Sequence, residues 1–307
     1  MIHDETVTIR PLRAGDEVAW RDLWAGYLAY YETALPEDVY VSSLARMLSG
    51  RRDEFHGMIA EMGGRPVGLV HYHFHPSSWS VTDACYLQDL FTLPEARGRG
   101  VARALIEAVY AAADAADAPG VYWFTQDFNA TARRLYDRIG TLTPFVRYNR
   151  RFGPMTDPQA GVTIRPLGAK DEAAWRRLWA AYLDFYEADL PDEVTQTTFA
   201  RLLSEDARGM RGLLLEVDGK AAGIVHYVFH RTGWKQEDVC YLQDLYALPE
   251  LRGRGLGRAL IEAVYGKADA AGAPAVYWLT QSFNTTARLL YDRIGVPTPF
   301  IAYDRPL

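Results

Sequence analysis

The sequence predicts an α/β sandwich with a mixed sheet, built twice along one chain. Two observations predict it. A stretch of about 145 residues recurs at a fixed spacing. In each copy, hairpin strands come before a strand–helix–strand crossover. A chain of 307 residues also exceeds one typical core and suits two domains of about 150 residues each.

The repeat keeps one spacing from end to end. VTIRPL begins at Val7 and again at Val162, and CYLQDL begins at Cys85 and again at Cys240, so both recur after 155 residues. About 85 of the 146 positions aligned in this way are identical. We therefore predict an N-terminal domain over 1–152, a linker over 153–161 that is rich in Gly, Pro and polar residues, and a C-terminal domain over 162–307.

Each copy opens with a short strand and two helices. In the first copy, Val7–Pro11 alternates as a strand does. Asp16 is placed to cap a helix that runs to about Tyr31, because Trp, Leu and Tyr recur there at helical spacing. A second helix covers roughly residues 41–48.

A hairpin and a third strand follow. Residues 56–62 and 66–75 read as two strands around Gly63-Gly64. The second copy has Asp218-Gly219 at this turn, which is typical of a tight hairpin. Residues 84–93 form the next strand, which Pro94 ends.

The last part of each copy is the crossover. A Gly/Arg turn leads into an alanine-rich helix over about 101–116, and a short buried strand covers 121–125. Residues 129–139 predict a further helix and 144–150 a final strand.

Composition and charge exclude several classes of protein. The net charge of −6 without a basic block speaks against nucleic-acid binding. No apolar run approaches the roughly 18 residues of a membrane span, and the first residues show no signal peptide. Two cysteines in 307 residues are no disulfide scaffold. We expect a cytoplasmic protein that binds neither nucleic acid nor membrane.

The most informative segment is a glycine-rich turn between a strand and a helix. It reads Arg97-Gly98-Arg99-Gly100 in the first copy and Arg252-Gly253-Arg254-Gly255 in the second. Glycines let backbone N–H groups approach a ligand, and the helix N-terminus adds free donors and a positive dipole end. The turn therefore predicts a pyrophosphate cradle. It lacks the Lys-Ser/Thr of a P-loop, and the hairpin strands before it disfavour a dinucleotide-binding unit.

At this turn the sequence resembles a known family. The pattern R-x-x-G-x-[GA] is met by Arg97, Gly100 and Ala102, and by their counterparts in the second copy. Together with FNATARRLYDRIG it is similar to the acetyl-CoA motif of the GNAT N-acetyltransferases. Within that superfamily, GLVHYHFHPSSWS and CYLQDLFTLPEARGRG resemble diamine (spermidine/spermine) and thialysine acetyltransferases.

The resemblance implies a fold and a cosubstrate. Each half would be a mixed, mostly antiparallel sheet with helices on both faces, in which a bulge splays two strands so that acetyl-CoA enters between them. No metal is expected. The residues that would hold acetyl-CoA are Leu90, Phe91, Thr92, Arg97, Gly98, Arg99, Gly100, Val101, Ala102 and Asn129 in the first copy, and Leu245, Tyr246, Ala247, Arg252, Gly253, Arg254, Gly255, Leu256, Gly257 and Asn284 in the second. Asn129 and Asn284 serve equally well as helix N-caps.

The resemblance also assigns catalytic groups. Tyr136 and Tyr291 match the tyrosine that faces the CoA sulfur, and we expect them to be general acids. The base is less defined, because Gln88 and Gln243 stand where the polyamine enzymes have a glutamate. An amide is no base at neutral pH, so a water oriented by the glutamine would have to take the proton from the amine.

The carboxylates near these positions are candidates for substrate binding. Asp89 and Asp244 follow the glutamines, and the resemblance implies that they bind a substrate ammonium. Glu32 and Glu187 are candidates for the same task or for surface ion pairs. His71, His73 and His75 share a strand face, but the second copy has Val228 at the middle position, which argues against a metal site. Cys85 and Cys240 are expected to be buried thiols rather than acetyl carriers.

Three functions remain open. The first is acetylation of a small amine such as a polyamine, a diamine or a lysine-like compound. The second is a different acceptor, namely an antibiotic, an amino acid or a protein N-terminus. The third is a non-catalytic acyl-CoA-binding regulatory protein. The fused halves would imitate a homodimer about a pseudo-twofold axis, so we expect a monomer.

Overall fold

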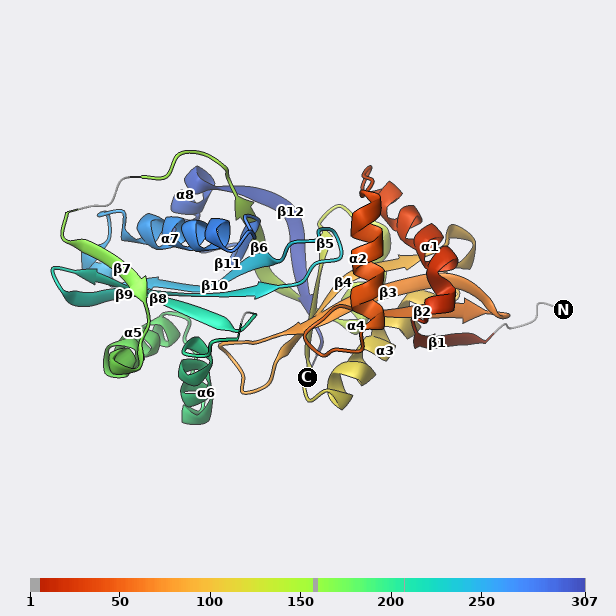
Figure 1. Cartoon of the computed structure of the whole chain (residues 1–307), viewed down its shortest axis with the longest axis horizontal. Helices are drawn as coiled ribbons and strands as arrows, with labels where there is room; N and C mark the ends of the chain where they lie inside the picture. The colour runs from red at the N-terminus through yellow and green to blue at the C-terminus, as the bar shows by residue number, and fades with distance from the viewer. Residues whose placement is uncertain (1–5, 157–159, 207, 307) are drawn as a thin grey trace.

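The computed structural model describes residues 6–156, 160–206 and 208–306. Part of the predicted linker, 157–159, lies outside the described residues. Figure 1 shows two lobes side by side, joined by strands that run through the middle of the molecule. None of the described helices has the length and apolar character needed to cross a membrane.

Both halves contain the same succession of elements. The elements of the first half are β1 Val7–Pro11, α1 Glu17–Tyr30, α2 Glu37–Leu48, β2 His56–Met62, β3 Arg65–His75, β4 Ala84–Thr92, α3 Val101–Ala115, β5 Gly120–Gln126, α4 Ala130–Ile139 and β6 Thr141–Arg150. Those of the second half are β7 Val162–Pro166, α5 Glu172–Phe185, α6 Asp192–Leu202, β8 Met210–Val217, β9 Lys220–His230, β10 Val239–Ala247, α7 Leu256–Ala270, β11 Val276–Gln281, α8 Thr285–Ile294 and β12 Gly295–Asp304.

Most elements lie where the sequence predicts them, with local differences. The second helix begins at Glu37 rather than near residue 41, because Pro36 already provides its start. Asp16 does not cap α1 through its side chain. Its carboxylate instead pairs with Arg10 at 2.6 Å and accepts a hydrogen bond from the Arg13 backbone N–H at 2.8 Å. At the β8–β9 hairpin, Asp218 and Gly219 both have positive φ, as a type I′ turn requires.

Helices cover both faces of the sheet in each half. In the first half, α1 and α2 pack Trp20, Trp24 and Leu44 against one face. The other face receives α3, whose Leu105 and Ile106 are fully buried. Each half therefore has two apolar clusters separated by its sheet, and the expected GNAT-type layering is confirmed.

The last strands of the two halves are exchanged. All strands form one 12-stranded sheet in the order β1-β2-β3-β4-β5-β12-β6-β11-β10-β9-β8-β7. Strand β12 pairs with β5 of the first half, whereas β6 pairs with β11 of the second half. Read from either edge, this order is the same succession of equivalent strands, as internal twofold pseudosymmetry demands.

Because of this exchange, the two repeats of the sequence do not coincide with the two halves of the folded sheet. The predicted ranges 1–152 and 162–307 separate the two repeats along the chain, but neither range forms a complete sheet unit in space. The N-terminal unit takes β12 from residues 295–304, and the C-terminal unit takes β6 from residues 141–150. A local reading of the sequence places each strand with its own half, because strand propensity carries no information about the partner strand.

Candidate active site

The site begins where two parallel strands separate. Strands β4 and β5 pair from Ala84 and Gly120 as far as Leu87 and Trp123. Directly afterwards the pairing of β4 with β3 slips by one residue, so that Gln88 is bulged out. The second half repeats this, with pairing that ends at Leu242 and Trp278 and a bulge at Gln243. The predicted bulge and splayed strand pair are therefore present twice.

A cavity of about 640 Å³ fills the gap between the separated strands in the first half. Its walls come from α1, β4, the glycine-rich turn, β5 and α4. The predicted residues that line it are Gln88, Leu90, Phe91, Thr92, Arg97, Gly98, Gly100, Val101, Ala102, Asn129 and Tyr136. Residues from distant parts of the sequence thus meet in one concave space with both polar and apolar walls, as in ligand sites.

The glycine-rich turn supplies unoccupied backbone donors to this cavity. Gly98 and Gly100 have φ of +74° and +83°, which side chains with a Cβ adopt only under strain. Gly100 is also the N-cap of α3, and no side chain caps that helix. The first N–H groups of α3 therefore lack an internal acceptor and can receive an anionic group. Gly253 and Gly255 adopt the same conformation before α7.

The two predicted general acids occupy equivalent, buried positions. Tyr136 and Tyr291 each retain 8% of their accessible surface. Burial raises the pKa of both phenols well above the usual value, so both keep their proton at neutral pH. Tyr136 lines the cavity and packs edge-on against Trp123, with ring centroids 5.6 Å apart. Burial thus keeps the proton on the phenol and also makes the phenol a weaker acid than free tyrosine.

The two candidate asparagines are helix caps. Asn129 Oδ1 accepts a hydrogen bond from the Ala132 N–H at 3.2 Å, and Asn284 does the same with Ala287. Asn129 also lines the cavity, and its Nδ2 donates to Thr125 at 3.3 Å. Its capping role is direct, and a contact with a ligand remains compatible with it.

A buried histidine–aspartate pair lies behind the bulge. His71 Nδ1 is 2.9 Å from Asp89 Oδ2, and the Trp20 indole donates to His71 Nε2 at 2.9 Å. Because an indole N–H can only donate, Nε2 must be unprotonated and Nδ1 must carry the proton. His71 therefore donates from Nδ1 to the Asp89 carboxyl group. His226, Asp244 and Trp175 repeat this arrangement.

Each aspartate is also bound by a tryptophan from the opposite half. We call residues 231–238 the second exchange loop and residues 76–83 the first exchange loop. From the second loop, Trp234 donates to Asp89 Oδ1 at 2.9 Å. From the first loop, Trp79 donates to Asp244 Oδ1 at 3.0 Å. Both sites are therefore composite, since each is completed by a loop of the other half.

The exchange loops are fixed by arginines of the half that receives them. Arg201 on α6 donates to the carbonyl oxygens of Ser77 and Ser80 at 2.8 and 2.7 Å. Arg46 on α2 donates to the carbonyl oxygen of Lys235 at 3.0 Å. Trp234 thereby stands against the rings of Tyr27 and Tyr31, with centroids 6.0 and 5.7 Å away. The result is an aromatic wall at one end of the cavity.

The glutamine at the bulge contacts the second exchange loop. In the amide orientation that satisfies its neighbours, Gln88 donates to Thr232 Oγ1 at 3.2 Å and accepts from the Gly233 N–H at 3.3 Å. The bulge therefore turns Gln88 toward the opposite half. Its contacts explain an amide at this position better than a role in proton transfer does.

The predicted substrate carboxylates do not reach the cavity. Asp89 and Asp244 are essentially inaccessible to solvent and are held by the histidine and tryptophan donors described above. Glu32 and Glu187 are exposed residues with positive φ, directly after the first helix of each half. No Asp or Glu of the described residues lines the cavity. The expectation of direct carboxylate contact with an ammonium group therefore lacks geometric support.

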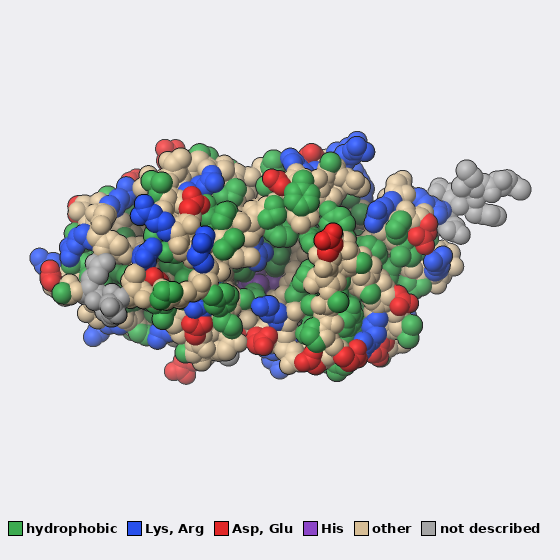
Figure 2. Space-filling model, turned by 90° about the horizontal axis from the view of Figure 1, so that it is seen from above, with side chains coloured by type: hydrophobic (Ala, Val, Ile, Leu, Met, Phe, Trp, Pro, Cys, Tyr) green, Lys and Arg blue, Asp and Glu red, His purple; other side chains and the backbone are tan. Residues whose placement is uncertain are grey.

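Other histidines meet at the centre of the molecule. The rings of His73 and His230 stack with centroids 4.6 Å apart, and His75 lies 5.7 Å from His230. Figure 2 shows histidine atoms at the bottom of a hollow between the two halves. Within the described ranges, no group of three or more His, Cys, Asp or Glu side chains has a geometry that could hold a metal ion. Cys85 and Cys240 are fully buried, and burial raises the pKa of both thiols, which makes them poor nucleophiles.

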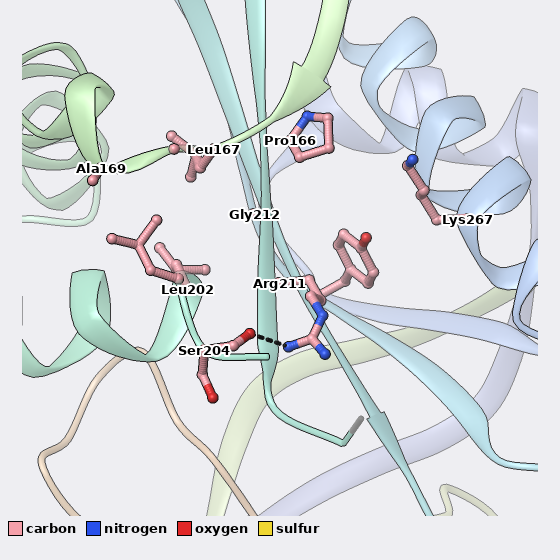
Figure 3. A pocket seen from close by; sticks show the side chains of 11 residues that line it. Pro166, Leu167, Ala169, Leu202, Ser204, Arg211, Gly212 and Lys267 are labelled. Atoms are coloured by element: carbon pink, nitrogen blue, oxygen red, sulfur yellow. Dashed lines mark hydrogen bonds between the residues drawn. The ribbon is translucent and has the colours of Figure 1, made fainter. Parts of the chain in front are cut away.

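A second hollow of about 590 Å³ lies elsewhere in the second half. Figure 3 shows it between the end of β7, the end of α6 and α7, with Leu167, Leu202, Arg211 and Lys267 around it. Arg211 donates there to the Ser204 carbonyl oxygen at 3.0 Å. None of the predicted site residues lines this hollow. We therefore place the active site at the splayed strands.

Comparison with known proteins agrees with this geometry. The D-amino-acid N-acetyltransferase HPA3 of Saccharomyces cerevisiae is 40% identical over 145 residues, which are 47% of this chain and 90% of the yeast protein. The mycothiol acetyltransferase of Frankia casuarinae is 28% identical over 258 residues, covering 79% of this chain and 71% of that protein. The crystal structure of a GCN5-related N-acetyltransferase from Sphaerobacter thermophilus superimposes with a TM-score of 0.59 at 16% identity, over 98% of this chain and 96% of that one.

The family itself follows from a match in each half. The model of the acetyltransferase (GNAT) family matches residues 18–141 and again residues 175–296. These two segments contain both splayed strand pairs, both glycine-rich turns and both buried tyrosines. The chain therefore belongs to the GNAT acetyltransferase family and carries two of its domains in tandem.

Proposed function

We propose that both halves transfer an acetyl group from acetyl-CoA directly to the primary amine of a small molecule. One observation carries the proposal. In the first half, a single cavity brings together the separated strands, the uncapped glycine-rich turn and the buried Tyr136, and the second half repeats the same elements. The resemblance to polyamine enzymes rests on sequence motifs alone, so the acceptor is part of the proposal.

Acetyl-CoA fits the cavity by its chemistry. The pyrophosphate would lie on the backbone N–H groups of residues 97–102, with Arg97 beside it. The pantetheine arm would follow the free edge of β4 along Leu90, Phe91 and Thr92. A backbone N–H at this edge would bind the thioester oxygen as negative charge develops on it, as in an oxyanion hole. Gly253, Gly255 and the β10 edge would do the same in the second half.

The reaction requires one attack and two proton movements. The neutral amine attacks the thioester carbonyl carbon, the new C–N bond forms and the C–S bond breaks. The departing CoA thiolate takes a proton from Tyr136 or Tyr291. Because no carboxylate lines the described cavity, we propose that burial of the amine disfavours its ammonium form, so that the amine binds neutral and its N–H proton leaves to water after the attack. Gln88 and Gln243 then act by holding the exchange loops in place.

The acceptor class has two candidates. The sequence motifs favour a diamine, a polyamine or a lysine-like amine. The similarity to the yeast D-amino-acid N-acetyltransferase over nearly its whole length favours an amino acid. Both candidates use the same proposed chemistry. Because β6 and β12 already join the two halves in one sheet, we propose that the chain is a monomer, which light scattering can measure.

The test is a calorimetric titration with acetyl-CoA, followed by a thiol-release screen over amines with the same sample. We expect two equivalents to bind and thiol release to depend on the amine. Acetyl-CoA at 100 times its dissociation constant should stabilise the fold by about 2.7 kcal/mol. Binding of acetyl-CoA without thiol release for any polyamine, diamine or amino acid would favour the non-catalytic alternative instead.

A further inference from the structure

The two halves differ in charge at one position beside the acceptor end of the site. Arg147 lies on β6, and the equivalent residue of the second copy, on β12, is Ala302. Two residues further on, Asn149 corresponds to Asp304. The family motifs include neither position. The two copies therefore differ by one guanidinium group at this position, because Ala302 carries only a methyl group.

Arg147 lies among aromatic rings in the middle of the molecule. Its guanidinium carbon is 4.1 Å from the ring centroid of Tyr277, 5.4 Å from that of Phe124 and 6.0 Å from that of Phe300. Its Nε donates to Asn149 Oδ1 at 3.2 Å. Among the described residues no carboxylate forms an ion pair with it. The charge is thus held in place by rings and by an amide, and none of the carboxylates that the structure describes pairs with it.

The rings around Arg147 come from both halves. Its strand, β6, pairs with β11, which carries Tyr277, and Arg147 does not itself line the cavity of the first site, but two of its other neighbours lead to that cavity. Phe124 lines the cavity, and Phe300 stacks on Tyr31, which lines it too. Tyr86 is influenced by the same groups. Burial raises the pKa of Tyr86 to about 12, Asp89 and Tyr31 raise it as well, and Arg147 lowers it by charge and hydrogen bonding. The ring of Tyr86 packs edge-on against that of Phe124, with centroids 5.4 Å apart, so Tyr86 lies beside the same wall of the cavity.

The second site has the opposite character at this place. Phe124 is replaced by Leu279 and Arg147 by Ala302. Burial raises the pKa of Tyr241, the counterpart of Tyr86, and the charge of Asp304 is among the influences that raise it further. Desolvation in turn raises the pKa of Asp304 to about 6. The charge of Asp304 thus acts on Tyr241, whereas the charge of Arg147 acts on its counterpart, Tyr86.

We propose that the first site selects an amine that also carries a carboxylate, and that Arg147 is the group that binds this carboxylate. A guanidinium presents a planar fork of N–H donors that matches a carboxylate, and aromatic rings on its faces keep the fork oriented. The acceptor is then an amino acid or a related amino carboxylate, with its amine toward the bulge of β4. The second site, with Ala302, lacks this selection. The inference rests on the proposed acetyl transfer and specifies its acceptor.

The experiment uses the full chain with one site silenced at a time. Tyr291→Phe leaves the first site to be measured, and Tyr136→Phe leaves the second. In each background, kcat/KM is measured for D- and L-phenylalanine and for the corresponding carboxamides, which lack the negative charge. With the first site alone, Arg147→Ala should lower kcat/KM for the acid by about 10- to 150-fold, since it removes hydrogen bonds to a charged group. The carboxamide should be unaffected.

Matched variants separate charge from packing. Arg147→Lys keeps the charge without the fork and should give an intermediate loss for the acid. With the second site alone, Arg147→Ala should change nothing, and Ala302→Arg should improve the acid over the carboxamide. Alanine at the equivalent position of β12 indicates that the strand tolerates Arg147→Ala. Equal losses for acid and carboxamide, or equal preference for the acid at both sites, would overturn the inference.

A binding measurement keeps this test independent of turnover. Quenching of tryptophan fluorescence, with Trp234 at the site, reports binding of the amino acid and of its carboxamide to the full chain in the presence of CoA. We expect Arg147→Ala to weaken binding of the acid alone. Absence of turnover with every amine, together with charge-selective binding, would overturn the proposed acetyl transfer but not the role of Arg147. Turnover without any selectivity for the carboxylate would overturn only the role of Arg147.

Discussion

The two composite sites share a framework but hold their aspartates differently. Both Asp89 and Asp244 accept hydrogen bonds from a histidine of their own half and a tryptophan of the other. Asp244 has two further donors, Ser78 Oγ at 2.5 Å and the Tyr182 hydroxyl at 2.9 Å. At the place of Ser78, the loop that reaches Asp89 has Gly233.

Gly233 lacks the hydroxyl group of Ser78, and it lies beside a larger side chain, that of Phe55. A Cβ at Gly233 would lie 3.3 Å from the ring of Phe55, whereas the counterpart of Phe55 in the second half is Met210. Phe55 and Gly233 come from opposite halves, as do Met210 and Ser78. The comparison teaches that residues have changed in pairs across the two halves. Each composite site is therefore one packing unit, although the sequence assigns its parts to different repeats.

The largest expected effect separates the two sites by their tyrosines. Tyr136→Phe should lower turnover at the first site by about 10²- to 10⁴-fold, because the CoA thiolate loses its proton donor. Tyr291→Phe should do the same at the second site. Thiol release with acetyl-CoA and amine measures both variants, and their acetyl-CoA affinity, measured by calorimetry, serves as the control. A double variant with normal turnover would contradict the assigned role.

The next prediction tests the exchange of loops. Trp234→Ala removes a donor from the buried Asp89 carboxylate and should impair the first site, although Trp234 belongs to the second repeat. We expect a loss of about 2–4 kcal/mol in the free energy of unfolding, because one buried carboxyl oxygen of Asp89 loses its donor and the packed ring is removed. Trp79→Ala is the matched variant and should impair the second site instead. Urea unfolding and turnover in the single-site backgrounds distinguish these outcomes. Damage confined to the repeat that carries the mutation would rule out a composite site.

A smaller effect is expected from exchanging the paired residues. Ser78→Gly should cost about 1.5–3 kcal/mol, since a hydroxyl bound to a buried carboxylate is lost. Gly233→Ser should destabilise the first site through contact with Phe55, and adding Phe55→Met should restore much of the loss. A double-mutant cycle on the free energy of unfolding measures the coupling. Additive effects of Gly233→Ser and Phe55→Met would show that the two residues are independent.

The smallest predicted effect concerns His73, whose counterpart is Val228. Both ring nitrogens of His73 are buried without a hydrogen-bond partner in the described structure. Burial lowers the pKa of His73 well below its usual value and that of His230 to about 3. The unfolded chain takes up protons below about pH 6.5 while these folded histidines do not. Stability is therefore complete above that pH and falls as the pH drops toward 3, by up to about 1.4 kcal/mol per unit and histidine.

His73→Val copies the second half and should reduce this loss. We expect a shallower fall in the free energy of unfolding between pH 7.5 and 5, together with a gain of up to about 1 kcal/mol at neutral pH from removal of an unsatisfied polar group. Urea titrations at the two pH values measure both effects. An unchanged pH dependence would show that His73 is protonated in the folded protein.

Several parts of the site were within reach of the sequence. The repeat, the order of strands and helices and the glycine-rich turn follow from patterns of neighbouring residues, and the structure confirms the fold that they predict. The positions of Tyr136 and Gly100 follow from short motifs for the same reason. The hydrogen-bond partners of the aspartates, in contrast, could not be predicted from the sequence. Asp89 follows a glutamine in the strand, but nothing nearby in the sequence indicates His71, 18 residues earlier, or Trp234, 145 residues later, as its partners.

What the sequence determined by itself is the local architecture of each repeat, because periodicity and turn chemistry act over a few residues. What only the tertiary structure decided is which repeat completes which site. Strands β6 and β12 are equally able to pair with β5 or β11, and the exchange loops are equally polar in either setting. Their choice depends on contacts between residues far apart in the chain, such as Arg201 with Ser77 and Arg46 with Lys235, which exist only after the two halves have packed.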